Sequence, residues 1–149
     1  MVAQQPQAYR VLVADDEPEV VDLVEMMLEM EGGYITLSAM DGLQTLECIR
    51  SERPDLILLD VRMPKLSGLG VLDHLRSDPT TADIPVIMLS VAATYPDVRT
   101  ALDRGALAYL AKPFELREMT RLVARVLEMS IPERQQLRQH ALDNVTKEW

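Results

Sequence analysis

The sequence is poor in the side chains that build disulfides and zinc sites. Cys48 is its only cysteine, and His74 and His140 are its only histidines. A single thiol excludes an internal disulfide, and two scattered histidines are too few for a zinc centre. We therefore expect Cys48 to act as a small apolar side chain on a helix, and His74 to lie on a helix surface.

Long apolar runs and an excess of basic side chains are also missing. No run approaches the roughly 18 apolar residues that span a bilayer, and the first ten residues are polar where a secretory signal would be apolar. The formal net charge is -9, whereas a nucleic-acid surface begins with clustered Lys and Arg. We expect a cytoplasmic protein without direct nucleic-acid or membrane contacts, so that action on DNA would need another domain or partner.

What the sequence does contain is a set of short apolar segments. With 149 residues and 48% hydrophobic side chains, the chain can form one domain with a substantial core. The segments are too short for helices and lack polar alternation, which is typical of strands buried on both faces of a parallel sheet. Four are strong and the one at 34–38 is weaker: residues 11–14, 34–38, 56–59, 86–89 and 107–110.

Amphipathic segments with helical spacing lie between and after these strands. Gly32 and Gly33 are expected to end the first helix. The alternation of strand and helix predicts an α/β fold with parallel strands and right-handed crossovers. The predicted helices are residues 19–30, 43–50, 69–76, 95–104 and 116–129, with a sixth beginning near Ser130.

Polar residues follow the predicted strands at their carboxyl ends, which is where open parallel sheets bind ligands. Asp15 and Asp16 follow the first strand, Asp60 follows the third, Ser90 the fourth and Lys112 the fifth. Carboxylates that share one pocket need a compensating cation, and a site of few carboxylates suits Mg²⁺. An aspartate nucleophile, Mg²⁺, a lysine and a hydroxyl together favour phosphoryl transfer.

The pieces around these residues resemble the response-regulator receiver family over about residues 10–129. The resemblance lies in VLVADDE at 11–17, DLILLDVRMP at 55–64 followed by Ser67 and Gly68, PVIMLS at 85–90, and GALAYLAKPF at 105–114. It implies a flavodoxin-like, doubly wound five-stranded parallel sheet of strand order 2-1-3-4-5, here with an extra C-terminal helix. It also implies a cis bond between Lys112 and Pro113.

The resemblance further implies roles for single residues. Asp60 would accept a phosphoryl group from a histidine kinase or histidine phosphotransfer protein, with Lys112 and Ser90 contacting that group. The Mg²⁺ ligands would be Asp16 and Asp60 directly, Asp15 through water, and the backbone carbonyl of Arg62. Ser90 and Tyr109 would be the residues that switch conformation, and the output would be altered protein contacts at the face of residues 95–104, the last strand and the last receiver helix. This makes the chain a signalling domain rather than an enzyme, apart from catalysing its own phosphorylation and dephosphorylation.

Two residues depart from the common family pattern, and the segment after the receiver allows several arrangements. Val91 stands where the family usually has alanine, and the Arg62 side chain lies close to the acceptor, so the lifetime of the phosphorylated state is not readable from sequence. We expect an N-terminal tail at 1–9, a receiver domain at 10–129 and a helical extension or linker at 130–149. That last segment could pack on the domain, pair with a second copy in a homodimer, or lead to an output domain.

Several alternatives compete with the signalling interpretation. Asp15 and Asp16 could cap the helix beginning near Pro18, and Ser90, Tyr109 and Lys112 could each be ordinary turn, core or surface residues. An aspartyl phosphatase needs a second acid after the nucleophile, and residues 61–63 supply none. An interaction module without chemistry would not need every motif position, and a flavin-binding relative would need a phosphate loop after the first strand.

Overall fold

In the computed structural model of the protein, the described residues are 8–91 and 95–148, with the backbone alone for residues 95, 96 and 146–148. The expected N-terminal tail therefore lies mostly outside the described residues. The elements are β1 (Arg10–Ala14), α1 (Pro18–Gly32), β2 (Ile35–Ala39), α2 (Gly42–Glu52), β3 (Leu56–Asp60), α3 (Gly68–Ser77), β4 (Val86–Ser90), α4 (Tyr95–Asp103), β5 (Ala108–Ala111), α5 (Leu116–Glu128) and α6 (Ile131–Glu148).

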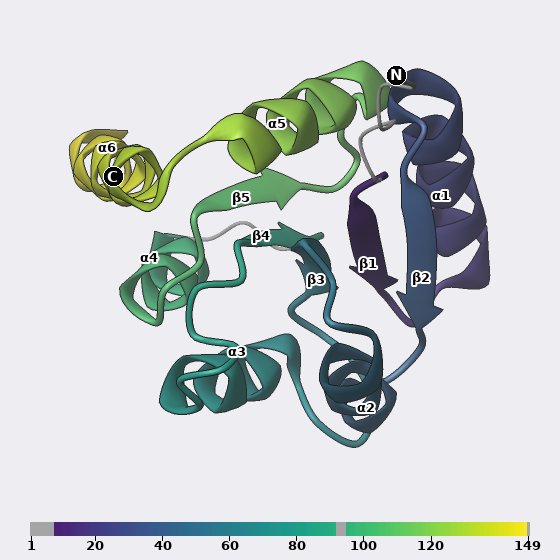
Figure 1. Cartoon of the computed structure of the whole chain (residues 1–149). Coiled ribbons are helices and arrows are strands. Elements are labelled where there is room, and N and C mark those ends of the chain that lie inside the picture. The colour runs from purple at the N-terminus through teal and green to yellow at the C-terminus, as the bar shows by residue number, and fades with distance from the viewer. Residues whose placement is uncertain (1–7, 92–94, 149) are drawn as a thin grey trace, which may run out of the picture.

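The strands form one parallel sheet in the order β2-β1-β3-β4-β5 (Figure 1). This is the doubly wound, flavodoxin-like arrangement that the resemblance implied, and the extra C-terminal helix is present. β5 begins and ends one residue later than predicted. Its pairing with β4 continues to Ser90 and Ala111. The apolar pattern does not mark this end of the strand, because Ala111 is exposed and not part of the core.

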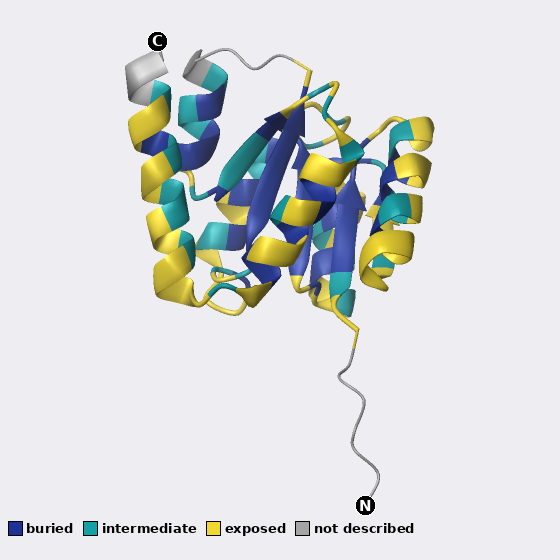
Figure 2. Cartoon of the chain, turned by 90° about the horizontal axis from the view of Figure 1, so that it is seen from above, coloured by how far each residue is buried: buried dark blue, intermediate teal, exposed yellow. Residues whose placement is uncertain are grey.

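Helices cover both faces of the sheet (Figure 1), and alternate strand residues supply two cores. Val11 and Val13 of β1 belong to the core beneath α1 and α5, whereas Leu12 and Ala14 face the core shared with α2 and α3. Every residue of β3 and β4 is buried, as the unbroken apolar segments predicted (Figure 2). Cys48 packs against the second core, as expected of a small apolar side chain.

Local side-chain chemistry sets the helix ends. Asp41 and Ser67 cap α2 and α3 by accepting backbone N–H bonds from Gln44 and Gly70. Ser130 and Glu133 bond reciprocally to each other's backbone N–H at the start of α6, where the sequence predicted that a sixth helix begins. Gly33, with φ of 63°, ends α1 in the left-handed conformation that glycine tolerates best.

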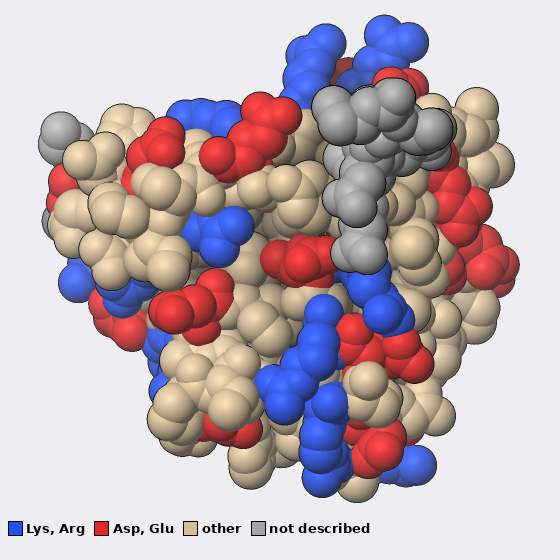
Figure 3. Space-filling view, in the orientation of Figure 1, with Lys and Arg blue, Asp and Glu red and all other residues tan. Residues whose placement is uncertain are grey.

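The surface carries charges of both signs. On the face drawn in Figure 3, side chains of both signs are present among the described residues, and several basic ones adjoin one another in a stripe at the lower centre. None of the helices in the described ranges is both long enough and apolar enough to cross a bilayer.

Candidate functional site

The carboxyl ends of β1 and β3 bring three aspartates together. Asp60 is the last residue of β3, and Asp15 and Asp16 directly follow β1, its neighbour in the sheet. The backbone N–H of Asp15 bonds to the carbonyl of Ala39, which extends the pairing of β1 with β2 by one residue. The strand order reverses here, since β1 continues to β2 on one side and β3 lies on the other, and this is the usual ligand crevice of such sheets.

The three carboxylates form one cluster. Each of Asp15, Asp16 and Asp60 offers an oxygen, and these oxygens all lie within 4.8 Å of one another. Asp15 is 0% exposed and Asp60 is 5% exposed, whereas Asp16 lies at the surface. Glu17 is the N-cap residue of α1 and makes no side-chain cap bond, while Asp15 Oδ1 accepts the backbone N–H of Glu17 at 3.0 Å. Asp15 therefore bonds to the backbone just before α1 as well as joining the cluster.

Lys112 reaches this cluster from the end of β5. Its Nζ donates to Asp15 Oδ2 at 2.5 Å and to Asp60 Oδ2 at 3.2 Å, and lies 3.6 Å from Glu17 Oε1. The Lys112 backbone N–H bonds to the carbonyl of Ser90 at 2.8 Å, which ties the two strand ends together. The bond to Pro113 is cis, as the resemblance implied.

The site holds more negative than positive charge. Burial raises the pKa of Asp60 to about 6, and the charge of Asp15 adds to this shift, against the opposing effect of Lys112. Burial also lowers the pKa of Lys112, but hydrogen bonding to Asp15 and the charges of Asp60 and Asp15 outweigh it and raise that pKa overall. Lys112 therefore stays charged, and a single ammonium group faces several acids.

Ser90 and Tyr109 lie next to the cluster on β4 and β5. Ser90 ends β4, is 2% exposed, and follows Leu89, which pairs with Asp60 in the sheet. Burial raises the pKa of Tyr109, while a hydrogen bond with the Ser90 side chain acts in the opposite direction. In the sheet, Tyr109 pairs with Met88, two residues before Ser90 in β4.

Arg62 borders the cluster through its backbone. Its N–H donates to Asp60 Oδ1 at 3.2 Å, while its side chain is exposed. Glu17 was not singled out from the sequence; its position directly after Asp15 and Asp16 was the available signal. All the residues that we predicted at this edge of the sheet therefore lie there.

The donor set fits a hard divalent cation. Three carboxylates contribute oxygen atoms, and Asp16 is exposed enough to leave room for water ligands. Magnesium prefers oxygen ligands and retains several waters, so few protein ligands suffice. A divalent cation would also offset the charge that raises the Asp60 pKa.

Comparison with known proteins identifies the fold family. The profile of the response regulator receiver domain matches residues 11–124. The chain belongs to the response regulator receiver family. Its receiver is 42% identical over 118 residues to the DNA-binding dual master transcriptional regulator RpaA of Synechocystis sp., covering 79% of this chain and 48% of that protein. The chain thus spans about half the length of the curated relatives it matches.

Solved receiver structures agree with the fold. A putative response regulator from Chloroflexus aurantiacus superimposes with a TM-score of 0.78 at 29% identity, covering 83% of this chain and all of that one. The receiver domain of the sensor histidine kinase PA1611 from Pseudomonas aeruginosa has a TM-score of 0.75 at 30% identity over the same shares. That structure is described as holding a magnesium ion in its active-site cleft.

A groove of about 430 Å³ adjoins the acidic cluster of the receiver. Glu17 and Lys112 line it together with apolar side chains of α1, of Val91 after β4 and of the segment after β5. Leu23, on the α1 side, is 44% exposed although it is a large apolar residue. The lining residues are Glu17, Val20, Leu23, Val24, Val91, Lys112, Pro113, Phe114 and Leu116.

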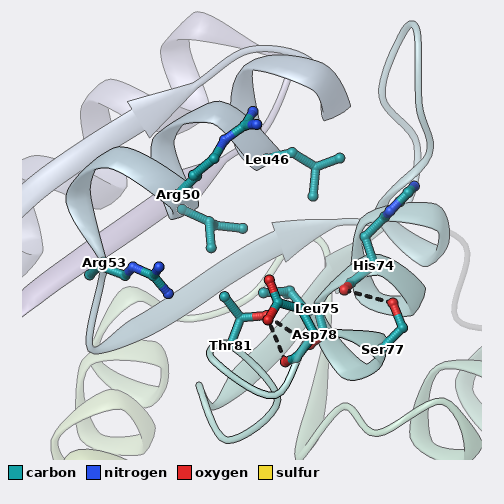
Figure 4. A pocket seen from close by; sticks show the side chains of 9 residues that line it. Leu46, Arg50, Arg53, His74, Leu75, Ser77, Asp78 and Thr81 are labelled. Carbon is teal, nitrogen blue, oxygen red and sulfur yellow. Dashed lines mark hydrogen bonds between the residues drawn. The ribbon is translucent and has the colours of Figure 1, made fainter.

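A second cavity, of about 290 Å³, lies between α2 and α3 and takes no part in this site (Figure 4). His74 lines it and is exposed, as expected. Arg53 donates to Thr80, and Thr81 donates to the carbonyl of Leu75, so these two polar side chains at the cavity already bind the protein. These contacts indicate a structural junction between two helices.

Proposed function

We propose that this receiver is a phosphorylation-dependent signalling switch with Asp60 as its phosphoryl acceptor. The observation that carries the proposal is the 3.2 Å contact between Lys112 Nζ and Asp60 Oδ2, inside a cluster of three carboxylates. A nucleophilic carboxylate and a fixed cation beside it are the parts that phosphoryl transfer requires. We take residues 10–129 as the receiver and residues 130–149 as its helical extension.

The transfer step is a substitution at phosphorus. A carboxylate oxygen of Asp60 forms a bond to the phosphorus of a donor phosphohistidine, and the bond from phosphorus to the imidazole nitrogen breaks. The electron pair of that bond stays on the nitrogen, which then takes up a proton. Dephosphorylation follows when water attacks the same phosphorus, releasing inorganic phosphate and restoring the Asp60 carboxylate.

The neighbouring side chains stabilise the charge of the transferred group. Lys112 would pair with one phosphoryl oxygen, and the Ser90 hydroxyl would donate a hydrogen bond to another. We assign Mg²⁺ to Asp16, Asp60 and the Arg62 carbonyl directly, with Asp15 acting through water. The bound ion would supply positive charge at the phosphoryl oxygens and keep Asp60 ionised at neutral pH.

The phosphodonor is a histidine kinase or a histidine phosphotransfer protein in the cytoplasm. The groove beside Lys112 supports a docked protein donor, since the exposed apolar side chains of Leu23 and Val91 line it together with Lys112. We propose that output follows from altered protein contacts at the face formed by α4, β5 and α5.

Acetyl phosphate with Mg²⁺ tests the proposal without knowledge of the kinase. Intact mass should show one added phosphoryl group on the parent and none on Asp60→Asn. Asp22→Asn, which changes an exposed aspartate on α1, is the matched control and should behave as the parent does. A parent that gains no phosphoryl group while a known receiver does in the same buffer would refute the proposal.

A further inference from the structure

The last helix, α6, lies against α4 and β5 (Figures 1 and 2). Leu142 of α6 is 7% exposed and forms a small apolar cluster with Val98 and Leu102 of α4. Ala141 and Val145 of α6 pack against this cluster. Of the three arrangements that the sequence left open for this segment, packing on the domain is therefore present.

Polar contacts also hold α6 in place. Arg138 Nε donates to the carbonyl of Leu102 at 2.7 Å, and its Nη2 donates to the carbonyl of Asp103 at 3.2 Å. These carbonyls end α4, where a helix leaves acceptors without intrahelical partners and carries partial negative charge. Arg138 thus acts as a C-terminal cap for α4 from a different helix, so the seat of α6 is specific in position.

Tyr109 connects this seat to the acidic cluster. Its ring packs against both the core beneath α2 and α3 and the Val98, Leu102 and Leu142 cluster. Its hydroxyl shares a hydrogen bond with Ser90, which follows the residue paired with Asp60. One side chain therefore touches both the apolar seat of α6 and the hydroxyl nearest the proposed phosphoryl group.

We propose that the face formed by α4 and β5 is an interaction surface whose occupant is α6, and that phosphorylation of Asp60 releases this helix. This inference rests on the proposed function. A phosphoryl oxygen is a stronger acceptor than a neutral hydroxyl, so it takes the Ser90 hydroxyl from Tyr109. The Tyr109 side chain then shifts, and the Val98, Leu102 and Leu142 cluster against which its ring packs loosens.

The composition of α6 makes it the element that detaches most easily. Leu142 is its one buried residue among those whose side chains are described, and most of the helix is exposed (Figure 2). A helix held by one buried side chain and by the partly buried Leu137, Ala141 and Val145 opens at lower free energy than the fully buried central strands do. Release of α6 thereby converts a local change at Ser90 and Tyr109 into a large change of surface.

Hydrogen–deuterium exchange of the full chain tests the inference, with Mg²⁺ and beryllofluoride as a stable stand-in for the phosphoryl group. Occupancy is measured on the same samples by native mass spectrometry. We expect exchange in peptides of residues 131–148 to accelerate at least about fivefold when the site is occupied, while peptides of β3 keep their protection. Occupancy without any change in α6 would overturn this inference alone, whereas absence of both occupancy and acetyl-phosphate labelling would overturn it together with the proposed function.

Two substitutions separate docking from coupling. Leu142→Ala removes the buried contact and should accelerate α6 exchange without beryllofluoride by about tenfold, whereas the exposed Gln136→Ala should not. Tyr109→Phe keeps the ring but removes the hydroxyl, and should abolish most of the beryllofluoride dependence. A Tyr109→Phe protein whose α6 still responds as fully as the parent would contradict the assigned route.

Discussion

Nζ of Lys112 lies 3.2 Å from Oδ2 of Asp60, although 52 positions separate the two residues in the sequence. The same nitrogen contacts Asp15 at 2.5 Å, so two buried carboxylates share one ammonium group. Removal of one partner from a buried ionic group leaves the remaining charges without compensation. The stability of this receiver should therefore depend on its functional site.

Lys112→Ala should destabilise the protein in the absence of Mg²⁺. We expect a loss of about 2 to 4 kcal/mol at pH 7 in urea unfolding, because Asp15 and Asp60 lose their buried partner. Added Mg²⁺ should restore part of this loss. Lys65→Ala is the control, since Lys65 is exposed and pairs with Asp41 at 3.5 Å; equal effects of the two substitutions would contradict the prediction.

The metal-free protein should lose stability as the pH rises through about 6. The pKa of Asp60 is raised from 3.8 to about 6 in the folded state, so protonation favours folding. The contribution of Asp60 protonation to the free energy of unfolding is complete below about pH 4 and is lost as the pH rises past about 6. The free energy of unfolding should fall by roughly 1 to 3 kcal/mol over this range.

Asp60→Asn removes this titration. We expect the variant to be more stable than the parent at pH 7.5 in EDTA, with the difference shrinking at pH 4.5 and when Mg²⁺ is added to the parent. Urea unfolding across this pH range measures it, with Asp22→Asn as the control. A pH-independent difference would mean that the Asp60 charge is not the cause.

Gly68→Ala should disturb the loop that follows Asp60. A Cβ atom at Gly68 would lie 2.0 Å from the backbone oxygen of Asp60, and the Gly68 N–H bonds to the Val61 carbonyl. Since backbone must move, we expect a loss of about 1 to 3 kcal/mol and slower labelling by acetyl phosphate.

Gly70→Ala is the matched comparison for this prediction. Its new Cβ would lie 2.6 Å from Cδ1 and 3.1 Å from Cγ of Leu66, a side chain that can rotate, and at ordinary contact distance from Ser67 Oγ. Because alanine favours helices over glycine, the variant should be near neutral. The prediction fails if both substitutions slow labelling equally.

Arg76→Met should weaken the edge of the sheet opposite the site. The Arg76 guanidinium donates to the carbonyls of Ala82, Ile84 and Gly105 at 2.6, 2.9 and 2.8 Å. Loss of these partly buried bonds should cost about 2 to 4 kcal/mol in thermal or urea unfolding. Arg50→Met, at an exposed ion pair with Glu47, should change stability little. Arg76→Lys should retain only part of the stability that Arg76 provides, because an ammonium group cannot span three carbonyls.

The fold was predictable because the strands have a distinctive sequence pattern. The buried segments before Asp60 and Ser90 have no polar alternation, and their ends place the chemistry at one edge of the sheet. The contact of Lys112 with Asp15 and the bonds of Arg76 were not predictable, because they join residues far apart in sequence and depend on side-chain reach. The packing position of α6 was not predictable either, since only Leu142 and its neighbours distinguish the buried side of this helix. The bounds of β5 were also not predictable, because its pairing with β4 extends to Ser90 and does not follow from the composition of β5 itself.

The parallel order of β1, β3 and β5 has a consequence for how the molecule can be assayed. Asp15, Asp60 and Lys112 come from three strands that are not consecutive along the chain, and β4 must be inserted before the lysine can approach the acids. A partial sheet of β1 and β3 could hold the three acids, but Lys112 joins them only after β4 and β5 are in place. Phosphoryl uptake that depends on Lys112 should therefore report the joining of β5 during refolding, and could be used to follow that step.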